Sequence, residues 1–310
     1  MADGNCTEVP QFTLAGLTEH PQLKFILLGL FLGTYTLTLV GNLGLIVLIR
    51  VSPQLHTPMY FFLSALSFLD VCYSSTISPR MLLDLPAGPR AMSLAGCLAQ
   101  LYFYAAFCTA EAYLLAVMAY DRFVAISQPL LYQLLMSPAL CARLVAGCFL
   151  GGLLSAATHA GAALRLSFCG PLLIDDFYCD GPPLFLLASS DRALNEALVL
   201  MLAGFNIAAT SLLILGSYAC AAVAVGRTGP GAGWRKACST CSAHLAALGI
   251  LYVSIAFNYM QPSSARSLRS KKVASVFYTV VVPLVNPVVY SLRNEEVKNA
   301  LGIFIGRMHS

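Results

Sequence analysis

Seven apolar stretches, each long enough to cross a lipid bilayer as a helix, occupy most of this chain of 310 residues. A helix rises about 1.5 Å per residue, so about 20 apolar residues span the hydrocarbon core. The chain is 58% hydrophobic and 10% charged, whereas soluble domains carry about a quarter charged residues. The sequence therefore predicts an all-α membrane protein, a seven-transmembrane helix bundle with short loops. The expected spans are 25–49, 58–83, 97–120, 139–161, 194–225, 237–260 and 273–292.

Two segments flank the predicted bundle of residues 25–292. Residues 1–24 lack the basic start, short apolar core and cleavage site of a signal peptide, so we expect an N-terminal tail and an uncleaved first helix. After the last span, apolar residues recur at helical spacing at 297, 300, 301 and 304. We therefore expect residues 293–310 to form a short amphipathic helix and tail on the membrane surface.

The charges of the loops indicate which way the bundle faces. Lys and Arg are divided equally between the two sides, so the positive-inside rule does not decide. Acidic residues lie mostly on the N-terminal side, which leaves the C-terminal side positive and suited to anionic cytoplasmic lipid. Asn5-Cys6-Thr7 is a glycosylation sequon, which requires a lumenal N-terminus. These observations predict an extracellular N-terminus with a glycosylated Asn5, and a cytoplasmic C-terminus.

Four blocks of sequence resemble signatures of vertebrate olfactory receptors, a branch of the rhodopsin-like G-protein-coupled receptors. They are LHTPMYFFLSALS (55–67) followed by Asp70, MAYDRFVAIS (118–127), KACSTCSAH (236–244) and PLVNPVVYSLRN (283–294). Gly41-Asn42 and Ser217-Tyr218 also fit, so the resemblance runs over nearly the whole chain. Charged residues at the end of a span are costly unless they have a function, and the adjacent Asp121 and Arg122 end the third span.

The resemblance implies an odorant receptor that is not an enzyme. It would bind a small, neutral, volatile odorant in a transmembrane pocket and activate a stimulatory olfactory-type heterotrimeric G protein, raising cyclic AMP. Its other expected partners are membrane lipid and a trafficking chaperone, with no nucleic acid, and its expected location is the plasma membrane of olfactory cilia. A related receptor that senses a metabolite in non-olfactory tissue remains open. A transporter is disfavoured, because Asp70 and Glu111 are too few charged residues to line a pathway.

The resemblance also assigns an activation switch. Arg122 would be held by Asp121 at rest and released toward the G protein, with Phe123 in place of the commoner tyrosine. Asn286-Pro287-x-x-Tyr290 resembles the hinge of the seventh helix, and Tyr218 is the expected partner of that hinge beside Arg122 in the active state.

Asp70 and Glu111 are the carboxylates that lie well inside the predicted spans. With Asn42 and Asn286 at matching depths they would form an oxygen-rich site for a cation. In similar receptors this cation is sodium, which stabilises the inactive state; we expect no other cofactor. The alternative is a protonated, hydrogen-bonded pair of carboxyls.

Cysteines on the N-terminal side face an oxidising compartment in the expected orientation. The resemblance implies a disulfide between Cys97 and Cys179. Ser189 stands where a partner for Cys169 is usual, so the state of Cys169 stays open, with a free thiol as one alternative. Asp176 replaces a histidine that is common in the family, which argues against metal-assisted recognition of thiols. Cys238, Cys241 and His244 could suggest zinc, but they lack a fourth ligand and fall in a block that the family uses for coupling.

Residues that share helix faces in the outer halves of four spans are expected to form the ligand pocket. None of them is charged, so the pocket favours a mostly apolar ligand with one or two hydrogen bonds. Each could instead be a helix-packing residue. The candidates are Tyr104, Cys108 and Thr109 in the third span, Leu202, Phe205, Asn206 and Ala209 in the fifth, Tyr252, Ile255, Ala256 and Tyr259 in the sixth, and Val276 and Thr279 in the seventh.

Overall fold

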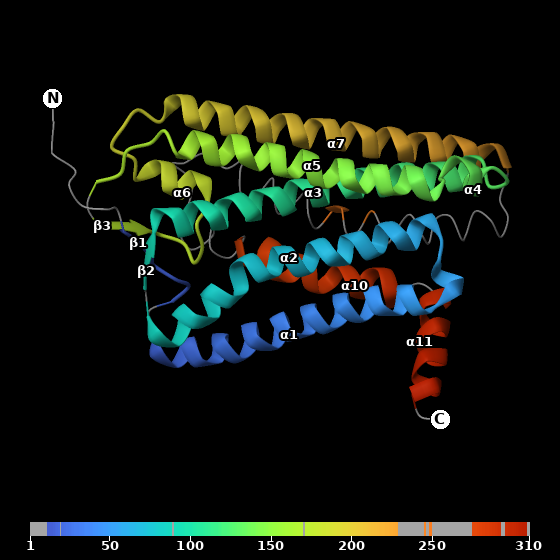
Figure 1. Ribbon diagram of the computed structural model, residues 1–310, viewed down its shortest axis with the longest axis horizontal. Helices are drawn as coiled ribbons and strands as arrows, with labels where there is room; N and C mark the ends of the chain where they lie inside the picture. Colours follow the sequence, from blue (N-terminus) through green and yellow to red (C-terminus); the bar gives the residue numbers. More distant parts are fainter. Residues whose placement is uncertain are drawn as a thin grey trace.

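Long helices lie side by side along one axis, and a small sheet covers one end of them (Figure 1). The computed structural model describes residues 11–18, 20–88, 90–169, 171–228, 245, 248–249, 275–292 and 295–308. Within these residues, five helices are long and apolar enough to cross a membrane. They are α1 (Pro21–Val51), α2 (Pro58–Ala87), α3 (Leu94–Ser127), α5 (Pro138–Ala163) and α7 (Ala193–Thr228).

These five helices coincide with the first five predicted spans; α2 begins at the predicted Pro58 and ends later, and the other four extend beyond their spans at both ends. α2 begins at Pro58, because proline is favoured in the first turn of a helix, where its missing N–H is no loss. Thr57 precedes it in an extended conformation, but its side chain makes no capping hydrogen bond. Ser93 and Ser137 do cap α3 and α5, accepting hydrogen bonds from the backbone N–H groups of Gly96 and Leu140.

The seventh predicted span contains a π-helical turn, Phe277–Val281, followed by α10 (Val282–Leu292). Pro287 has no N–H, so the carbonyl of Pro283, one turn earlier, loses its helical partner. The side chain of Asn42 in α1 donates to this carbonyl at 3.0 Å. A neighbouring helix therefore satisfies the group that the proline leaves unpaired, as expected for a membrane interior. Most of the sixth predicted span lies outside the described residues.

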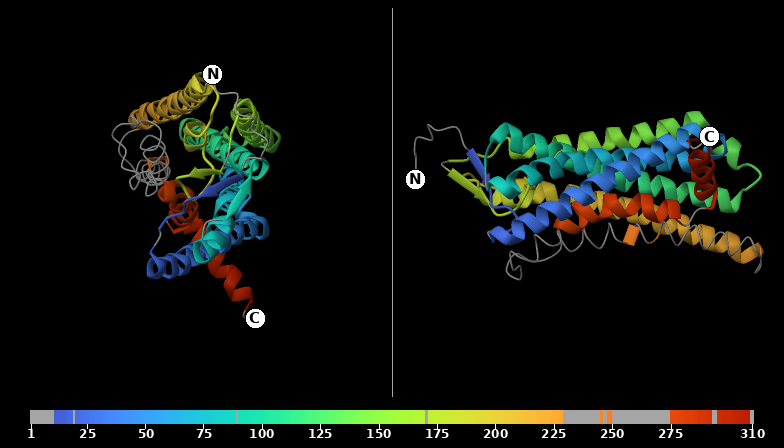
Figure 2. Two further views of the ribbon diagram at one scale, coloured as in Figure 1. Left: turned by 90° about the vertical axis from the view of Figure 1, so that its left-hand side faces the viewer. Right: turned by 90° about the horizontal axis from the view of Figure 1, so that it is seen from below.

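The final helix, α11 (Glu295–Met308), turns away from the long axis of the bundle (Figures 1 and 2). Val297 and Ala300 are buried against the bundle, whereas Leu301 is exposed. The hydroxyl of buried Tyr60, at the start of α2, donates to Glu296 at 2.8 Å. The predicted C-terminal helix is therefore present, and this hydrogen bond joins its first turn to the bundle.

Three short strands form a sheet that the sequence analysis did not predict. β1 (Gln11–Leu14) lies in the middle, antiparallel to β2 (Ala91–Ser93) and parallel to β3 (Pro171–Ile174), with Gln11 opposite Pro171. Phe12 and Leu14 alternate inward and are almost completely buried. The part of the tail that enters β1 is therefore fixed over the helix ends.

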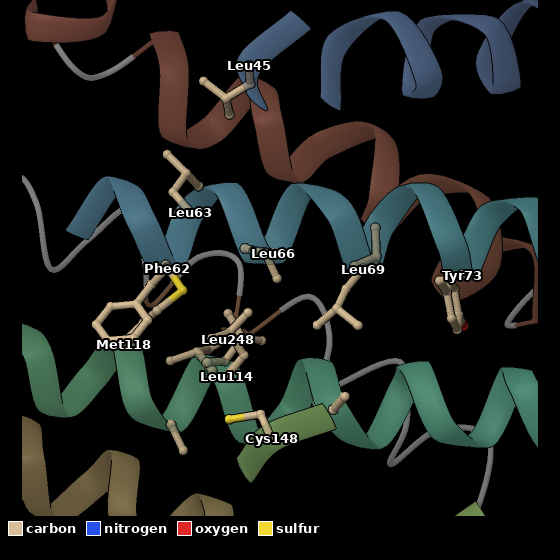
Figure 3. Packing of buried hydrophobic residues seen from close by; sticks show 14 of the residues in the cluster. Leu45, Phe62, Leu63, Leu66, Leu69, Tyr73, Leu114, Met118, Cys148 and Leu248 are labelled. Atoms are coloured by element: carbon tan, nitrogen blue, oxygen red, sulfur yellow. The ribbon is translucent and has the colours of Figure 1, made fainter. Parts of the chain in front are cut away.

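Buried apolar side chains fill the space between α2 and α3 (Figure 3). Phe62, Leu66 and Leu69 of α2 face Leu114 and Met118 of α3. On its other sides α3 packs against α5 and α7. α3 is therefore in contact with α2, α5 and α7 along the bundle.

Candidate functional site

A cavity of about 100 Å³ lies between α3, α5, α7 and the short helix α6 (Gly181–Leu186). α6 lies at the sheet end of the bundle (Figure 1). Its walls are largely apolar. Four of the candidate ligand residues line it: Tyr104, Cys108, Thr109 and Asn206. The cavity is smaller than the apolar cavity of about 150 Å³ that can hold benzene, so in this arrangement it suits only a very small ligand.

The structure places other candidate residues away from this cavity. The side chain of Phe205 is 69% exposed and faces outward, and Leu202 and Ala209 are half-buried without lining the cavity. The face of α7 that lines it carries Val199, Ala203 and Asn206. Because α7 is apolar all round, periodicity could not separate its inner face from its lipid face.

The remaining candidates lie elsewhere or cannot be placed. Thr279 is buried and donates to the Ser275 carbonyl at 2.6 Å, and Val276 packs against the core. Tyr252, Ile255, Ala256 and Tyr259, as well as Asn5, lie outside the described residues.

Asn206 joins the helices that surround the cavity. Its side-chain oxygen accepts from the hydroxyl of Tyr113 in α3 at 2.6 Å, and its amide donates to Ser155 in α5 at 3.2 Å. These bonds leave the cavity with few polar atoms for a ligand. Asn206 therefore sets the spacing of α3, α5 and α7 at this depth.

The cavity also contains a carboxylate that the sequence analysis missed. Asp180 lines the cavity and is buried, although the expectation was that no carboxylate would face the ligand. Its oxygens accept from the N–H of Gly181 at 2.8 Å and from the hydroxyl of Tyr178 at 3.3 Å, so it caps α6. Asp180 lies outside the predicted spans, in the loop just before α6, so helix-face spacing gives no signal for it. His159 of α5 was missed from the lining as well.

A second polar cluster lies in the middle of the bundle, where Asn286 of α10 meets two carboxylates. Its amide nitrogen lies 3.1 and 3.2 Å from the two oxygens of Asp70 and 3.2 Å from Glu111. All three side chains are buried. The side-chain oxygen of nearby Asn42 is buried and accepts no hydrogen bond from the described residues. These oxygens are of the type that binds hard cations, and in this structure the Asn286 amide donor lies between the two carboxylates.

The Asp121–Arg122 pair lies near the opposite end of α3. A guanidinium nitrogen of Arg122 is 3.2 Å from one oxygen of Asp121, and the hydroxyl of Tyr132 donates to the other at 2.8 Å. Tyr132 belongs to α4 (Tyr132–Leu135), a short helix in the loop after α3. Burial raises the pKa of the Tyr132 phenol, and the neighbouring Asp121 carboxylate raises it further, so the phenol stays protonated as a donor. Asp121 is thus held from two sides.

Of the predicted hinge residues Pro287 and Tyr290 and their expected partner Tyr218, only Tyr290 is described in part. Pro287 is buried in α10, and Tyr218 of α7 packs against the core. The backbone of Tyr290 falls in α10, and its side chain lies outside the described atoms.

We expect Tyr132→Phe to destabilise the protein, because Asp121 would keep its burial and lose a donor. The cost of about 1–2 kcal/mol corresponds to a fall of about 2–8 °C in melting temperature. Thermal unfolding of the purified protein in detergent measures this shift. The matched control is Tyr120→Phe, since Tyr120 is half exposed on the neighbouring helix. Equal melting temperatures for the two variants would contradict a structural role of the Tyr132 hydroxyl.

The predicted disulfide between Cys97 and Cys179 is present, with 5.4 Å between the Cα atoms. It joins the start of α3 to the loop after β3. Gln100 supports it by accepting from the N–H of Cys179 at 2.9 Å and donating to the Thr76 carbonyl at 3.1 Å. Phe12 of β1 belongs to the same buried cluster as both cysteines. The sheet and the disulfide therefore form one cover over this end of the bundle.

Cys169 is disulfide-bonded, which excludes the alternative of a free thiol. The sulfur of Cys169 lies 3.6 Å from the hydroxyl of Ser189, so Ser189 does stand beside Cys169, where the family usually has its partner. The absence of a cysteine at position 189 does not by itself leave Cys169 free.

Comparison with known proteins identifies the family. A family model described as olfactory receptor matches residues 31–306. Mouse olfactory receptor 8A1 is 51% identical over 301 residues, covering 97% of each chain. Human olfactory receptor 5F1 is 48% identical over 307 residues, covering 99% of this chain and 98% of the relative. The crystal structure of squid rhodopsin superposes with a TM-score of 0.73 at 15% identity, covering 91% of this chain and 80% of that one. The chain belongs to the olfactory receptor family, with the seven-transmembrane-helix fold of G-protein-coupled receptors, and it is not an enzyme.

Proposed function

We propose that this receptor binds small, neutral, volatile odorants in the cavity lined by α3, α5, α6 and α7, and activates a stimulatory olfactory-type G protein that raises cyclic AMP. One observation carries the proposal: α3 lines the cavity at Cys108 and bears the Asp121–Arg122 pair near its other end. The two sites are about 20 Å apart along one helix, at about 1.5 Å per residue. A ligand that shifts α3 therefore acts on the switch directly.

The apolar lining of the cavity supports a weakly bound, apolar ligand. Its polar side chains Asn206 and Asp180 already accept hydrogen bonds from the protein, which disfavours a charged ligand. Burying ~250 Å² of apolar ligand surface at ~25 cal/mol/Å² contributes roughly 6 kcal/mol before association costs. Micromolar or weaker affinity follows.

Activation requires that the ligand bind the active arrangement more tightly than the resting one. At rest, Asp121 holds Arg122, and Asn286 joins α2, α3 and α10 through Asp70 and Glu111. The π turn and Pro287 give the last span a point at which it can bend. Release of Arg122 on the inner side of the bundle then opens a surface for the G protein. Tyr218 would partner Tyr290 of the hinge beside Arg122 in this active arrangement.

Asp70, Glu111, Asn42 and the side-chain oxygen of Asn286 would hold a sodium ion if the Asn286 amide turned its oxygen inward. The ion would supply positive charge between the two carboxylates and favour the resting arrangement. A proton shared by the carboxyls would serve the same purpose. Sodium titration of ligand affinity in membranes separates these cases, since only the ion predicts weaker agonist binding with rising sodium at constant ionic strength.

The proposed orientation places the sheet outside the cell and α11 inside, at the plasma membrane of olfactory cilia. Asn5 would then be glycosylated. The proposed partners are the odorant, the stimulatory G protein, membrane lipid and a trafficking chaperone.

The test is a screen of cyclic AMP in cells that express the receptor with an olfactory G protein and a trafficking partner. A broad panel of neutral volatiles and a matched panel of non-volatile metabolites are applied, with surface staining in parallel. A response to volatiles supports the proposal. Responses confined to metabolites, or to charged compounds, would contradict the ligand class.

We expect Ala203→Phe to weaken the response to any ligand of this cavity by at least tenfold in half-maximal concentration. Ala203 lines the cavity, and the added ring would occupy most of its volume. Ala208→Phe is the control, because Ala208 is exposed on the same helix. Dose–response curves at matched surface expression measure the effect. If both variants respond like the parent receptor, the ligand binds elsewhere.

A further inference from the structure

His159 is a polar side chain of the cavity that makes no hydrogen bond within the part of the chain that the structure describes. It is half-buried in the last turns of α5. An imidazole carries at least one N–H donor, whichever tautomer it adopts. A donor that is covered and left unpaired is costly. A ligand that offers an acceptor to this ring is therefore favoured over one that covers the ring without pairing it.

His159 lies one turn beyond the link that Asn206 makes across the bundle. Ser155, which accepts from the Asn206 amide at 3.2 Å, is one turn before His159 on the same face of α5. α5 ends at Ala163, about 6 Å farther along at about 1.5 Å per residue. Ala163 belongs to the same buried cluster as Phe185 of α6, which lines the cavity (Figure 1). The imidazole therefore faces the cavity between the Asn206 link and α6.

Other polar groups of the lining find partners inside the protein. Asn206 uses both its oxygen and its amide in bonds to α3 and α5, and Thr210 donates to the Asn206 carbonyl at 2.7 Å. The hydroxyl of Thr109 can turn to a carbonyl of the preceding turn, as threonine commonly does in helices. An imidazole cannot pair with its own helix in this way. His159 is therefore the group that gains most from an acceptor on the ligand.

Asp180 restricts the chemistry of that acceptor. Its carboxyl lines the same cavity and accepts from the N–H of Gly181 at 2.8 Å and from the hydroxyl of Tyr178 at 3.3 Å. An ionised carboxylate is an acceptor only, so it cannot bond to a carbonyl or ether oxygen, and it repels an anion. Together, His159 and Asp180 favour a neutral oxygen-containing group over a carboxylate.

We propose that His159 donates a hydrogen bond to an oxygen of the ligand, and that the receptor recognises small neutral oxygenated volatiles such as ketones, aldehydes, esters and alcohols. The inference rests on the proposed function, because it takes this cavity as the ligand site. The oxygen lies beside α5 and α6. The apolar remainder of the ligand packs against small side chains of the opposite walls, Ala105 of α3 and Ala203 of α7.

The test compares two probes of nearly equal shape, cyclobutanone and methylenecyclobutane, in which a methylene group replaces the carbonyl oxygen. Apparent affinities come from the rise in melting temperature of the purified receptor with probe concentration. Apolar burial alone favours the hydrocarbon, because the ketone must give up its hydration. The quantity compared between variants is therefore the affinity ratio of the two probes. Partitioning of the probes into detergent is the same for every variant and cancels.

We expect His159→Phe to shift this ratio about tenfold toward the hydrocarbon, because the new ring keeps its bulk and loses its donor. His159→Gln keeps a donor and should return the ratio toward the parent value. Leu154→Phe is the control, since Leu154 is 61% exposed on the same helix, and it should leave the ratio unchanged. An unchanged ratio in His159→Phe overturns the proposal. A shift that His159→Gln does not reverse assigns the effect to packing and overturns the hydrogen bond.

Ala203→Phe separates failure of this inference from failure of the proposed ligand site. Its added ring would occupy the cavity, so neither probe should bind this variant. If the probes bind the parent receptor but not Ala203→Phe, and the ratio ignores position 159, the site stands and the role of His159 is overturned. Probes that bind Ala203→Phe as tightly as the parent, or that bind neither, overturn the site and this inference together. The measurement uses no G protein, so it does not depend on the signalling proposal.

Discussion

Gly152→Leu is expected to abolish surface expression, whereas Gly147→Leu on the same helix leaves it near the parent level. A Cβ atom at position 152 would overlap the backbone carbonyl oxygen of Ala106 and lie 3.0 Å from the Cβ of Ala110. Backbone atoms of α3 cannot move aside as a side chain can. α5 would have to separate from α3, and both helices line the cavity.

The size of this effect can be graded along α5. Overpacking a closed interface costs about 1–3 kcal/mol, and more where backbone must move. At Gly151 the added Cβ would meet only the ring of Tyr113, and at Gly147 it would meet nothing within 4 Å. Flow cytometry of surface-stained cells should therefore rank leucine variants as 147 above 151 above 152. Normal expression of Gly152→Leu would show that α3 and α5 are not in close contact.

Asn286→Asp is expected to cause the largest loss among single changes in the polar centre. It would place a third carboxyl beside Asp70 and Glu111 and remove the amide donor that the two share. Breaking a buried polar arrangement in this way costs about 3–5 kcal/mol. We expect little folded receptor, measured as the detergent-soluble monomeric fraction and its melting temperature.

The exchange Asp70→Asn with Asn286→Asp is the control for this effect. It restores one amide and one carboxyl to the same pair of positions, so folded receptor should return toward the parent level. An additive loss in the double variant would contradict a direct interaction between positions 70 and 286.

Helix positions could be predicted from the sequence because bilayer thickness fixes the length of an apolar span. Pro58 marked the start of α2, and the buried carboxylates Asp70 and Glu111 marked the polar centre that Asn286 completes. The Cys97–Cys179 disulfide followed from resemblance to the family.

Other features depend on contacts that no local pattern encodes. The strands of the sheet are three or four residues long and come from three distant segments, so alternation gave no signal. The outward position of Phe205 on α7 could not be predicted, because lipid and the interior of the bundle favour the same apolar residues. Asp180 reaches the cavity from a loop, and the disulfide of Cys169 depends on how the chain folds over the helix ends.

The central claim is that ligand binding in the cavity acts through Arg122. The most direct measurement is ligand-evoked cyclic AMP in cells with matched surface levels of the parent receptor, Arg122→Ala and Arg143→Ala. Arg143 is an exposed arginine in the first turns of α5, where it donates to the Ala139 carbonyl. We predict that Arg122→Ala loses the response while still folding and binding ligand, and that Arg143→Ala keeps it. A full response from Arg122→Ala would contradict the account.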